Sequence, residues 1–204
     1  MEQNEISRAT LGRLPVYLRY LNELPKDVRN ISATTIARDR GRGEVQVRKD
    51  LGAMSSTGKP RVGYLTSELT ERMEQILRSR EGGTIIVGTG KLGKALLDYK
   101  GFEEYGISIL AGFDQRISQP VRTKEGKLLL PMDELPAFCR EHQVRIGVIA
   151  VPAAAAQEVC NLLYENGVKA MWCFAPCRLY KPEDAVIQYE NMALSLAHLK
   201  MQLK

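Results

Sequence analysis

Apolar residues recur at helical spacing along the first 80 positions of the chain. Four leucines predict a first helix, and Pro15 stands near its start, where proline is tolerated. Ser32 is placed to cap a short second helix, and the glycine turn at 40–43 separates this helix from a third. A linker helix is predicted over 67–80. The leucines of the first helix are Leu11, Leu14, Leu18 and Leu21, and the buried face of the third is Val47, Leu51 and Met54.

After residue 81, short apolar runs alternate with segments of helical pattern. Such repeating β–α units predict an α/β fold with a parallel, doubly wound sheet. Strands are predicted over 84–87, 107–113, 145–151 and 169–174, with an irregular short strand ending at 130. Helices are predicted over 92–99 and 153–166, from a cap at Asp133 to near His142, and over 191–204.

A glycine-rich turn joins the first of these strands to its helix. Residues 84–93 read TIIVGTGKLG, and Asp114 follows the next apolar run. Gly88 permits the tight turn, Gly90 lets the backbone approach a pyrophosphate, and Gly93 lets helix and strand pack closely. The helix N-terminus directs N–H groups at phosphate, and Asp114 can accept hydrogen bonds from both ribose hydroxyls. This order predicts a Rossmann dinucleotide site, with a sheet turn that binds no ligand as the alternative.

Residues at the carboxyl ends of the later strands are further candidates for this site, because ligands bind at that edge of such sheets. Val151 and Pro152 end one strand, and Phe174 and Ala175 end the next. The predicted dinucleotide-binding residues are Gly88, Thr89, Gly90, Lys91, Leu92, Gly93, Asp114, Val151, Pro152, Phe174 and Ala175.

The net charge of +5 lies entirely before the dinucleotide motif: residues 1–80 hold 15 Lys and Arg against 10 Asp and Glu, and residues 81–204 are balanced. A concentrated basic segment in a small domain is typical of a nucleic-acid-binding surface. Two short helices around a glycine turn predict a helix-turn-helix, with a plain helical bundle as the alternative. In it Gln46, Arg48 and Lys49 suit base edges. Lys59 and Arg61, in a wing-like hairpin over 58–63, suit phosphates or the minor groove.

Other features narrow the class of protein. The four cysteines lack the spacing of a metal site and are interpreted as reduced structural thiols, so no metal is expected. No apolar run approaches the ~20 residues that span a bilayer. The first five residues are too acidic for a secretory signal, so the expected location is the cytoplasm. The last helix has more apolar positions than one narrow face needs, which predicts a homodimer contact; packing on its own sheet is the alternative.

Catalysis has little support in the sequence. No Tyr-x-x-x-Lys pair occurs, and His142 and His198 lie away from the predicted strand ends. A nucleotide bound without an evident acid, base or nucleophile is interpreted as a sensed ligand. Two alternatives stay open: a small NAD-dependent oxidoreductase with a basic dimerisation arm, and a constitutive DNA-binding protein whose Rossmann domain is a dimer scaffold.

Six segments, in the same order along the chain, carry a resemblance to a known family. They are 13–21 (RLPVYLRYL), 46–51 (QVRKDL), 62–64 (VGY), the 88–93 loop through 96–99 (LLDY), 150–152 (AVP) with 155–157 (AAQ), and 174–176 (FAP). In these segments the chain resembles the Rex family of redox-sensing transcriptional repressors. The resemblance implies a winged-helix domain over 1–80, a Rossmann domain over 81–186 that binds NADH or NAD, and a homodimer that exchanges its C-terminal helix over 187–204.

High NADH releases members of this family from operators of genes for fermentation and respiration, and two-fold symmetry predicts a palindromic operator. The chain departs from the family pattern at several positions. Pro60 and Arg61 replace an Arg-Gly pair in the wing, and Ala53 with Met54 replaces an aromatic pair. Arg116 stands where an acid is common.

Two neighbouring side chains, Asp114 and Arg116, bear on whether the effector is NAD(H) or NADP(H). Asp114 favours an unphosphorylated ribose, because a carboxylate repels a 2′-phosphate, whereas Arg116 could partly offset this and admit NADP(H). NAD(H) is the predicted effector, since Asp114 occupies the acid position itself.

A last departure concerns the switch. Asn191 aligns with an acid that the family links to a tyrosine matching Tyr99 and an arginine matching Arg19, and that helps couple ligand state to DNA state. A neutral Asn191 cannot form a charge-assisted pair with Arg19. We therefore predict that NADH binds, but releases DNA less completely than in a typical family member.

Overall fold

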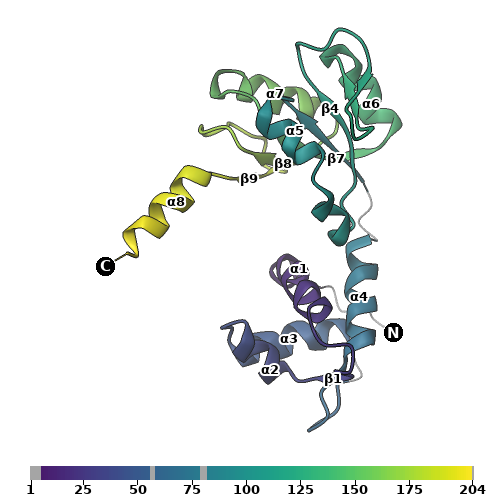
Figure 1. The fold of residues 1–204 in the computed structure, drawn as a ribbon, viewed down its shortest axis with the longest axis vertical. Coiled ribbons are helices and arrows are strands. Elements are labelled where there is room, and N and C mark those ends of the chain that lie inside the picture. Colours follow the sequence, from purple (N-terminus) through teal and green to yellow (C-terminus); the bar gives the residue numbers. More distant parts are fainter. Residues whose placement is uncertain (1–5, 56–57, 79–81, 204) are drawn as a thin grey trace. The chain divides into compact units, whose positions relative to one another are not determined.

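The chain forms two units, Met1–Glu81 and Gly82–Lys204, each with its own hydrophobic core (Figure 1). The computed structural model describes residues 6–55, 58–78 and 82–203. The domain boundary predicted between residues 80 and 81 lies outside the described residues.

The N-terminal unit has the winged-helix arrangement. Ser32 caps the second helix as predicted, accepting from the Thr35 N–H at 3.0 Å. The predicted apolar face of the third helix is buried, and Lys59 pairs with Gly63 in an antiparallel bridge that forms the wing. The elements are α1 (Arg8–Asn22), β1 (Asn30–Ile31), α2 (Ala33–Asp39), α3 (Glu44–Met54), β2 (Tyr64–Leu65), which is antiparallel to β1, and α4 (Thr66–Arg78).

Helix α1 begins earlier than expected, because Ser7 caps it by accepting from the Thr10 N–H at 3.1 Å. Pro15 therefore lies in the helix interior rather than near its start. Proline has no N–H to offer the carbonyl of Leu11, so burial of the apolar face, including Leu14 and Leu18, supports the helix instead.

The C-terminal unit is built on a seven-stranded sheet. Its strands are β3 (Gly83–Val87), β4 (Ile109–Phe113), β5 (Val121–Arg122), β6 (Leu128–Leu130), β7 (Val144–Ile149), β8 (Ala170–Cys173) and β9 (Val186–Tyr189). They lie in the order β5-β6-β4-β3-β7-β8-β9, and only β5 is antiparallel to its neighbour. From β6 to β9 this is the Rossmann order, which reverses between β3 and β7. The sheet continues to Tyr189, past the domain boundary predicted at 186.

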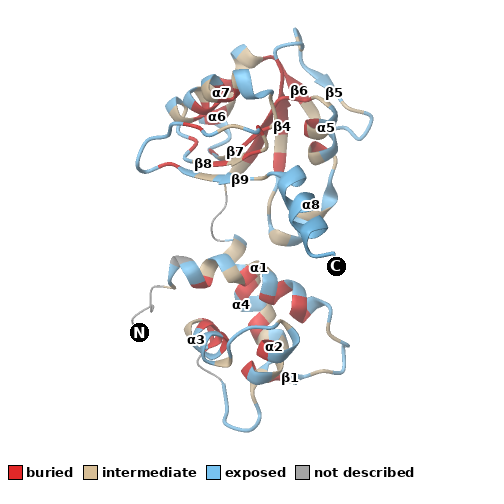
Figure 2. Ribbon diagram, turned by 90° about the vertical axis from the view of Figure 1, so that its left-hand side faces the viewer, coloured by how far each residue is buried: buried red, intermediate tan, exposed pale blue. Residues whose placement is uncertain are grey.

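Helices cover both faces of this sheet. α6 (Leu135–Glu141) and α7 (Ala153–Glu165) contribute to one buried cluster, and α5 (Lys91–Leu97) contributes to the cluster on the other face (Figure 2). Asp133 lies in a 3-10 turn, Met132–Glu134, and does not cap α6.

The last helix, α8 (Met192–Met201), is exposed along its whole length (Figure 2). Its apolar side chains lie in solvent in the single chain; Leu196, for example, is 68% exposed. Within the described ranges, no helix combines the length and apolar character needed to cross a bilayer.

Candidate dinucleotide pocket and DNA-binding face

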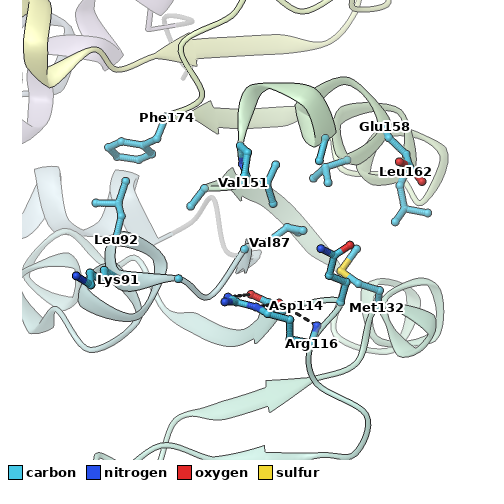
Figure 3. Close-up of a pocket in the computed structure, with 17 residues that line it drawn as sticks. Val87, Lys91, Leu92, Asp114, Arg116, Met132, Val151, Glu158, Leu162 and Phe174 are labelled. Carbon is cyan, nitrogen blue, oxygen red and sulfur yellow. Dashed lines mark hydrogen bonds and ion pairs between the residues drawn. The ribbon is translucent and has the colours of Figure 1, made fainter.

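The glycine-rich turn opens onto a cavity of about 740 Å³ at the carboxyl ends of the central strands (Figure 3). This is the point at which the strand order reverses, where Rossmann sheets bind their ligands. The volume is in the ordinary range of small-molecule pockets. Eight of the predicted residues line it: Gly88, Gly90, Lys91, Leu92, Asp114, Val151, Pro152 and Phe174.

The three glycines of the motif have different surroundings. Gly88 has a φ of +95°, and a Cβ there would lie 2.7 Å from the carbonyl of Ala150. A Cβ at Gly93 would lie 1.8 Å from the carbonyl oxygen of Gly88, so this glycine packs the helix onto the strand and does not line the cavity. Gly90 lines the cavity, and a Cβ there would meet no atom within 4 Å. The turn therefore leaves room for a ligand group at Gly90.

Asp114 is buried directly after β4, and both its carboxylate oxygens are engaged. Oδ2 accepts from the N–H and hydroxyl of Thr89, at 2.7 and 3.0 Å, and from Arg116 Nη2 at 2.9 Å. Oδ1 accepts from the backbone N–H and Nε of Arg116, each at 3.0 Å. The Arg116 hydrogen bonds hold the pKa of Asp114 well below its usual range, against the opposing effect of burial. A ribose hydroxyl must displace Arg116 to reach this carboxylate.

Two other predicted residues also lie off the cavity surface. Thr89 is buried and donates to Asp114, and Ala175, two residues after the end of β8, is buried in the core. The sequence reasoning missed nine residues that line the cavity: Val87, Gln115, Arg116, Met132, Ala150, Ala155, Glu158, Val159 and Leu162, of which only Arg116 was considered as a neighbour of the ribose. The spacing of Ala155, Val159 and Leu162 along α7 was the available signal, because it places them on one helix face.

Three basic side chains of the N-terminal unit line a groove of about 510 Å³. Arg48 reaches it from α3, and Lys59 and Arg61 reach it from the wing. Gln46 and Lys49 are exposed on the same helix but do not line the groove. The sequence-based prediction missed the three lining residues that carry hydroxyl groups, Ser32, Thr34 and Tyr64. Arg48 forms an ion pair with Glu44 one turn earlier, which it must leave in order to bind another anion.

A buried carboxylate fixes α3 against α1. Asp50 is 1% exposed and accepts from Arg13 Nε at 2.6 Å and from the hydroxyl of Tyr17 at 2.7 Å. Thr10 and Gln46 donate to it as well, each at 3.0 Å. Burial acts to raise the pKa of Asp50, but these hydrogen bonds outweigh it and keep that pKa below its ordinary value. Gln46 is exposed, but its amide nitrogen already donates one hydrogen bond within this network.

The three predicted coupling residues have local partners in the structure. Arg19 donates to Glu23 at 2.8 Å, and the ring of Tyr99 packs edge-on against Phe102. Asn191 caps α8 by accepting from the Leu194 N–H at 2.9 Å. Among the described residues, no group of His, Cys, Asp or Glu side chains is arranged to hold a metal ion, and the four cysteines are free thiols.

Comparison with known proteins extends these observations. Residues 5–52 match a sequence family described as "Putative DNA-binding protein N-terminus", and residues 79–177 match one described as "CoA binding domain". The chain is 36% identical to the redox-sensing transcriptional repressor Rex of Carboxydothermus hydrogenoformans, covering 100% of this chain and 99% of that protein. It is 35% identical to Rex of Desulforamulus reducens, over 100% and 98% of the two chains.

The chain belongs to the Rex family of redox-sensing transcriptional repressors. Solved structures agree. RSP, a Rex-family repressor, in complex with NAD+ and operator DNA superposes with a TM-score of 0.84 at 30% identity, covering 97% of this chain and 92% of RSP. RSP in complex with NADH gives a TM-score of 0.80 at 30% identity, covering 98% and 94%. These relatives are named as repressors, and none of the three is named as an oxidoreductase.

Proposed function

We propose that this Rex-family chain is a transcriptional repressor that binds operator DNA through its N-terminal unit and senses the NADH/NAD balance through the Rossmann sheet and helices of its C-terminal unit. One observation carries the proposal: a winged-helix groove lined by basic residues and a Rossmann cavity at the glycine turn occur on one chain. This chain aligns over 99% of the length of a redox-sensing repressor. RSP has been solved with operator DNA and NAD+ and also with NADH, which supports both halves of the assignment.

The cavity suits a dinucleotide. The pyrophosphate would lie against the backbone at Gly90, on the side left open by the absent Cβ. Asp114 would accept from the adenosine ribose once Arg116 moves aside, which directs the adenine toward Met132 and Leu162. Leu92, Val151 and Phe174 remain for the nicotinamide end (Figure 3). Pro152 follows Val151 directly and also lines the cavity.

We propose that DNA binds at the groove and along the exposed face of α3 beside it. Arg48, with Gln46 and Lys49 on the same helix, would read base edges in the major groove, where arginine pairs with guanine. Lys59 and Arg61 would contact phosphates or the minor groove from the wing. In a homodimer two such faces read a palindrome with half-sites at whole-turn spacing. We assign dimerisation to α8, the helical part of the segment predicted over 187–204, because its apolar side chains are exposed in the single chain. We expect this repressor in the cytoplasm, because the operator DNA that it binds and the NADH that it senses are found there.

The test is a titration of NADH into the full-length protein bound to DNA. A palindromic duplex, selected by the protein from a randomised pool, is compared with its scrambled sequence at physiological salt. We expect preferential binding of the palindrome and release by NADH. Equal binding of both duplexes would overturn the repressor assignment. Specific binding without any response to NADH would indicate a constitutive DNA-binding protein, and hydride transfer to an aldehyde, ketone or flavin would indicate an oxidoreductase.

Arg48→Ala tests the base-reading helix within the same assay. If Arg48 makes a bidentate base contact, its removal should cost about 1–3 kcal/mol of binding free energy and relax specificity. Arg72→Ala is the matched control, because Arg72 is exposed on α4 and does not line the groove. Equal losses in the two variants would indicate a general charge effect and no base readout by Arg48.

A further inference from the structure

A second cavity, of about 410 Å³, adjoins the dinucleotide cavity on the side of the ribose carboxylate. The two cavities share Gly90, Lys91, Asp114 and Arg116, so a ligand group bound in one can extend into the other. The second cavity also includes Lys94 from α5. The function proposed above gives this second cavity no role.

The charge in the second cavity is unusual for a site beside a ribose-binding acid. Three cationic side chains line it, Lys91, Lys94 and Arg116, against the single carboxylate of Asp114. Arg116 forms a bidentate pair with that carboxylate, and Figure 3 shows its guanidinium lying against the Asp114 side chain. The carboxylate that would repel a phosphate is therefore already compensated, and two further cations remain.

The guanidinium is also free to rearrange. The Arg116 side chain is 68% exposed, whereas Asp114 is held from the other side by the backbone and hydroxyl of buried Thr89. A ribose with a free 2′-hydroxyl must compete with Arg116 for the oxygens of Asp114. A ribose with a 2′-phosphate leaves this pair in place, and the guanidinium together with Lys94 can bind the phosphate through charge-assisted hydrogen bonds.

We propose that the second cavity is a subsite for the 2′-phosphate of NADP(H), so that this chain binds phosphorylated as well as unphosphorylated nicotinamide dinucleotide. Arg116 determines the preference between them: it opposes the ribose hydroxyls of NADH at Asp114 and favours the phosphate of NADPH. The proposal rests on the proposed function, since it extends the same dinucleotide site.

The test is direct binding of NADH and NADPH to the full-length protein, measured by calorimetry without DNA. We expect the wild-type dissociation constants to lie within about tenfold of each other. Arg116→Ala should weaken NADPH by about tenfold or more, because a hydrogen-bonded charge pair is lost. It should tighten NADH, because the oxygens of Asp114 become available. Lys94→Ala should weaken NADPH more than NADH. Lys124→Ala removes an exposed charge from the β5–β6 turn, outside both cavities, and serves as the matched control.

The outcomes separate the two proposals. If NADH binds but NADPH does not bind at about a hundredfold higher concentration, the phosphate subsite is overturned and the NADH-sensing function stands. If Arg116→Ala weakens both ligands by the same factor, Arg116 has only a structural role and the proposal is wrong. If neither ligand binds, the proposed function itself fails. Coenzyme A carries its extra phosphate on the neighbouring 3′-oxygen, and binding tighter than that of NADPH would overturn the assignment to the 2′ position.

Discussion

At the scale of single residues, substitution of two glycines three positions apart should affect different properties: NADH binding at Gly90 and stability at Gly93. Gly90→Val places a side chain in open space at the cavity, so it should abolish NADH binding. Because Gly90 is also the N-cap of α5, where valine is unfavourable, the unfolding free energy should fall by about 1 kcal/mol or less. Gly93→Ala drives a methyl group into the carbonyl of Gly88, and should destabilise the protein by about 1–3 kcal/mol or more.

Thermal unfolding by circular dichroism and titration with NADH measure the two effects on each variant. A Gly90→Val protein that binds NADH as the wild type does would contradict the placement of the pyrophosphate at this turn. Similar melting temperatures for wild type and Gly93→Ala would contradict the tight packing of α5 on β3.

The same residues illustrate how far the sequence predicts the site. The glycine turn and Asp114 could be found because their spacing reflects local backbone requirements. The engagement of Asp114 by Arg116 could not, because it depends on how the loop after β4 folds back. The α7 residues were missed for a related reason. Val159 lines the cavity and also belongs to the core. An apolar periodicity shows that a helix face is buried, but not whether a ligand or a neighbouring strand covers it.

At the scale of elements, the strongly patterned segments were predicted and the weakly patterned ones were not. β3, β4, β7 and β8 are buried central strands whose apolar runs are visible in the sequence. β9 at the sheet edge has only one half-buried residue, Ile187, and β5 has two exposed residues, so neither shows a clear alternation. Their positions come from pairing with β8 and β6, which is a tertiary effect.

The wing offers an element-scale prediction. Arg61 has a φ of +65°, a left-handed conformation that costs a non-glycine residue about 1 kcal/mol, and it stands where the family usually has glycine. Arg61→Gly should therefore be more stable than Arg61→Ala, which keeps the strain and loses the same charge. Both should weaken DNA binding and lower its salt dependence if Arg61 contacts a phosphate. Chemical denaturation and DNA binding at several salt concentrations measure these effects, and equal stability of the two variants would argue against strain at this turn.

At the scale of the whole molecule, regulation requires that the ligand state of one unit changes the DNA state of the other. The residues expected to do this belong to different units, since Arg19 is in α1, whereas Tyr99 and Asn191 are in the C-terminal unit. Within the chain each has a local partner, and their coupling role rests on the family resemblance. A sequence pattern within one element carries no information on coupling between residues of different units, so this coupling has to be tested by substitution.

Asn191→Asp is that substitution, and the structure makes it selective. Asn191 caps α8 through its side-chain oxygen, and aspartate caps helices equally well, so the variant adds a charge without removing the cap. A charge-assisted hydrogen bond to Arg19 is roughly twice as strong as a neutral one, which should widen the free-energy gap between the DNA-bound and released states. A ligand shifts such an equilibrium only through its differential affinity for the two states.

NADH should therefore release operator DNA incompletely from the wild type and more completely from Asn191→Asp. Asn191→Ser, which keeps a capping oxygen without the charge, should behave as the wild type does in the same titration. Full release from the wild type at low NADH, with no change in Asn191→Asp, would show that coupling in this chain does not pass through residue 191.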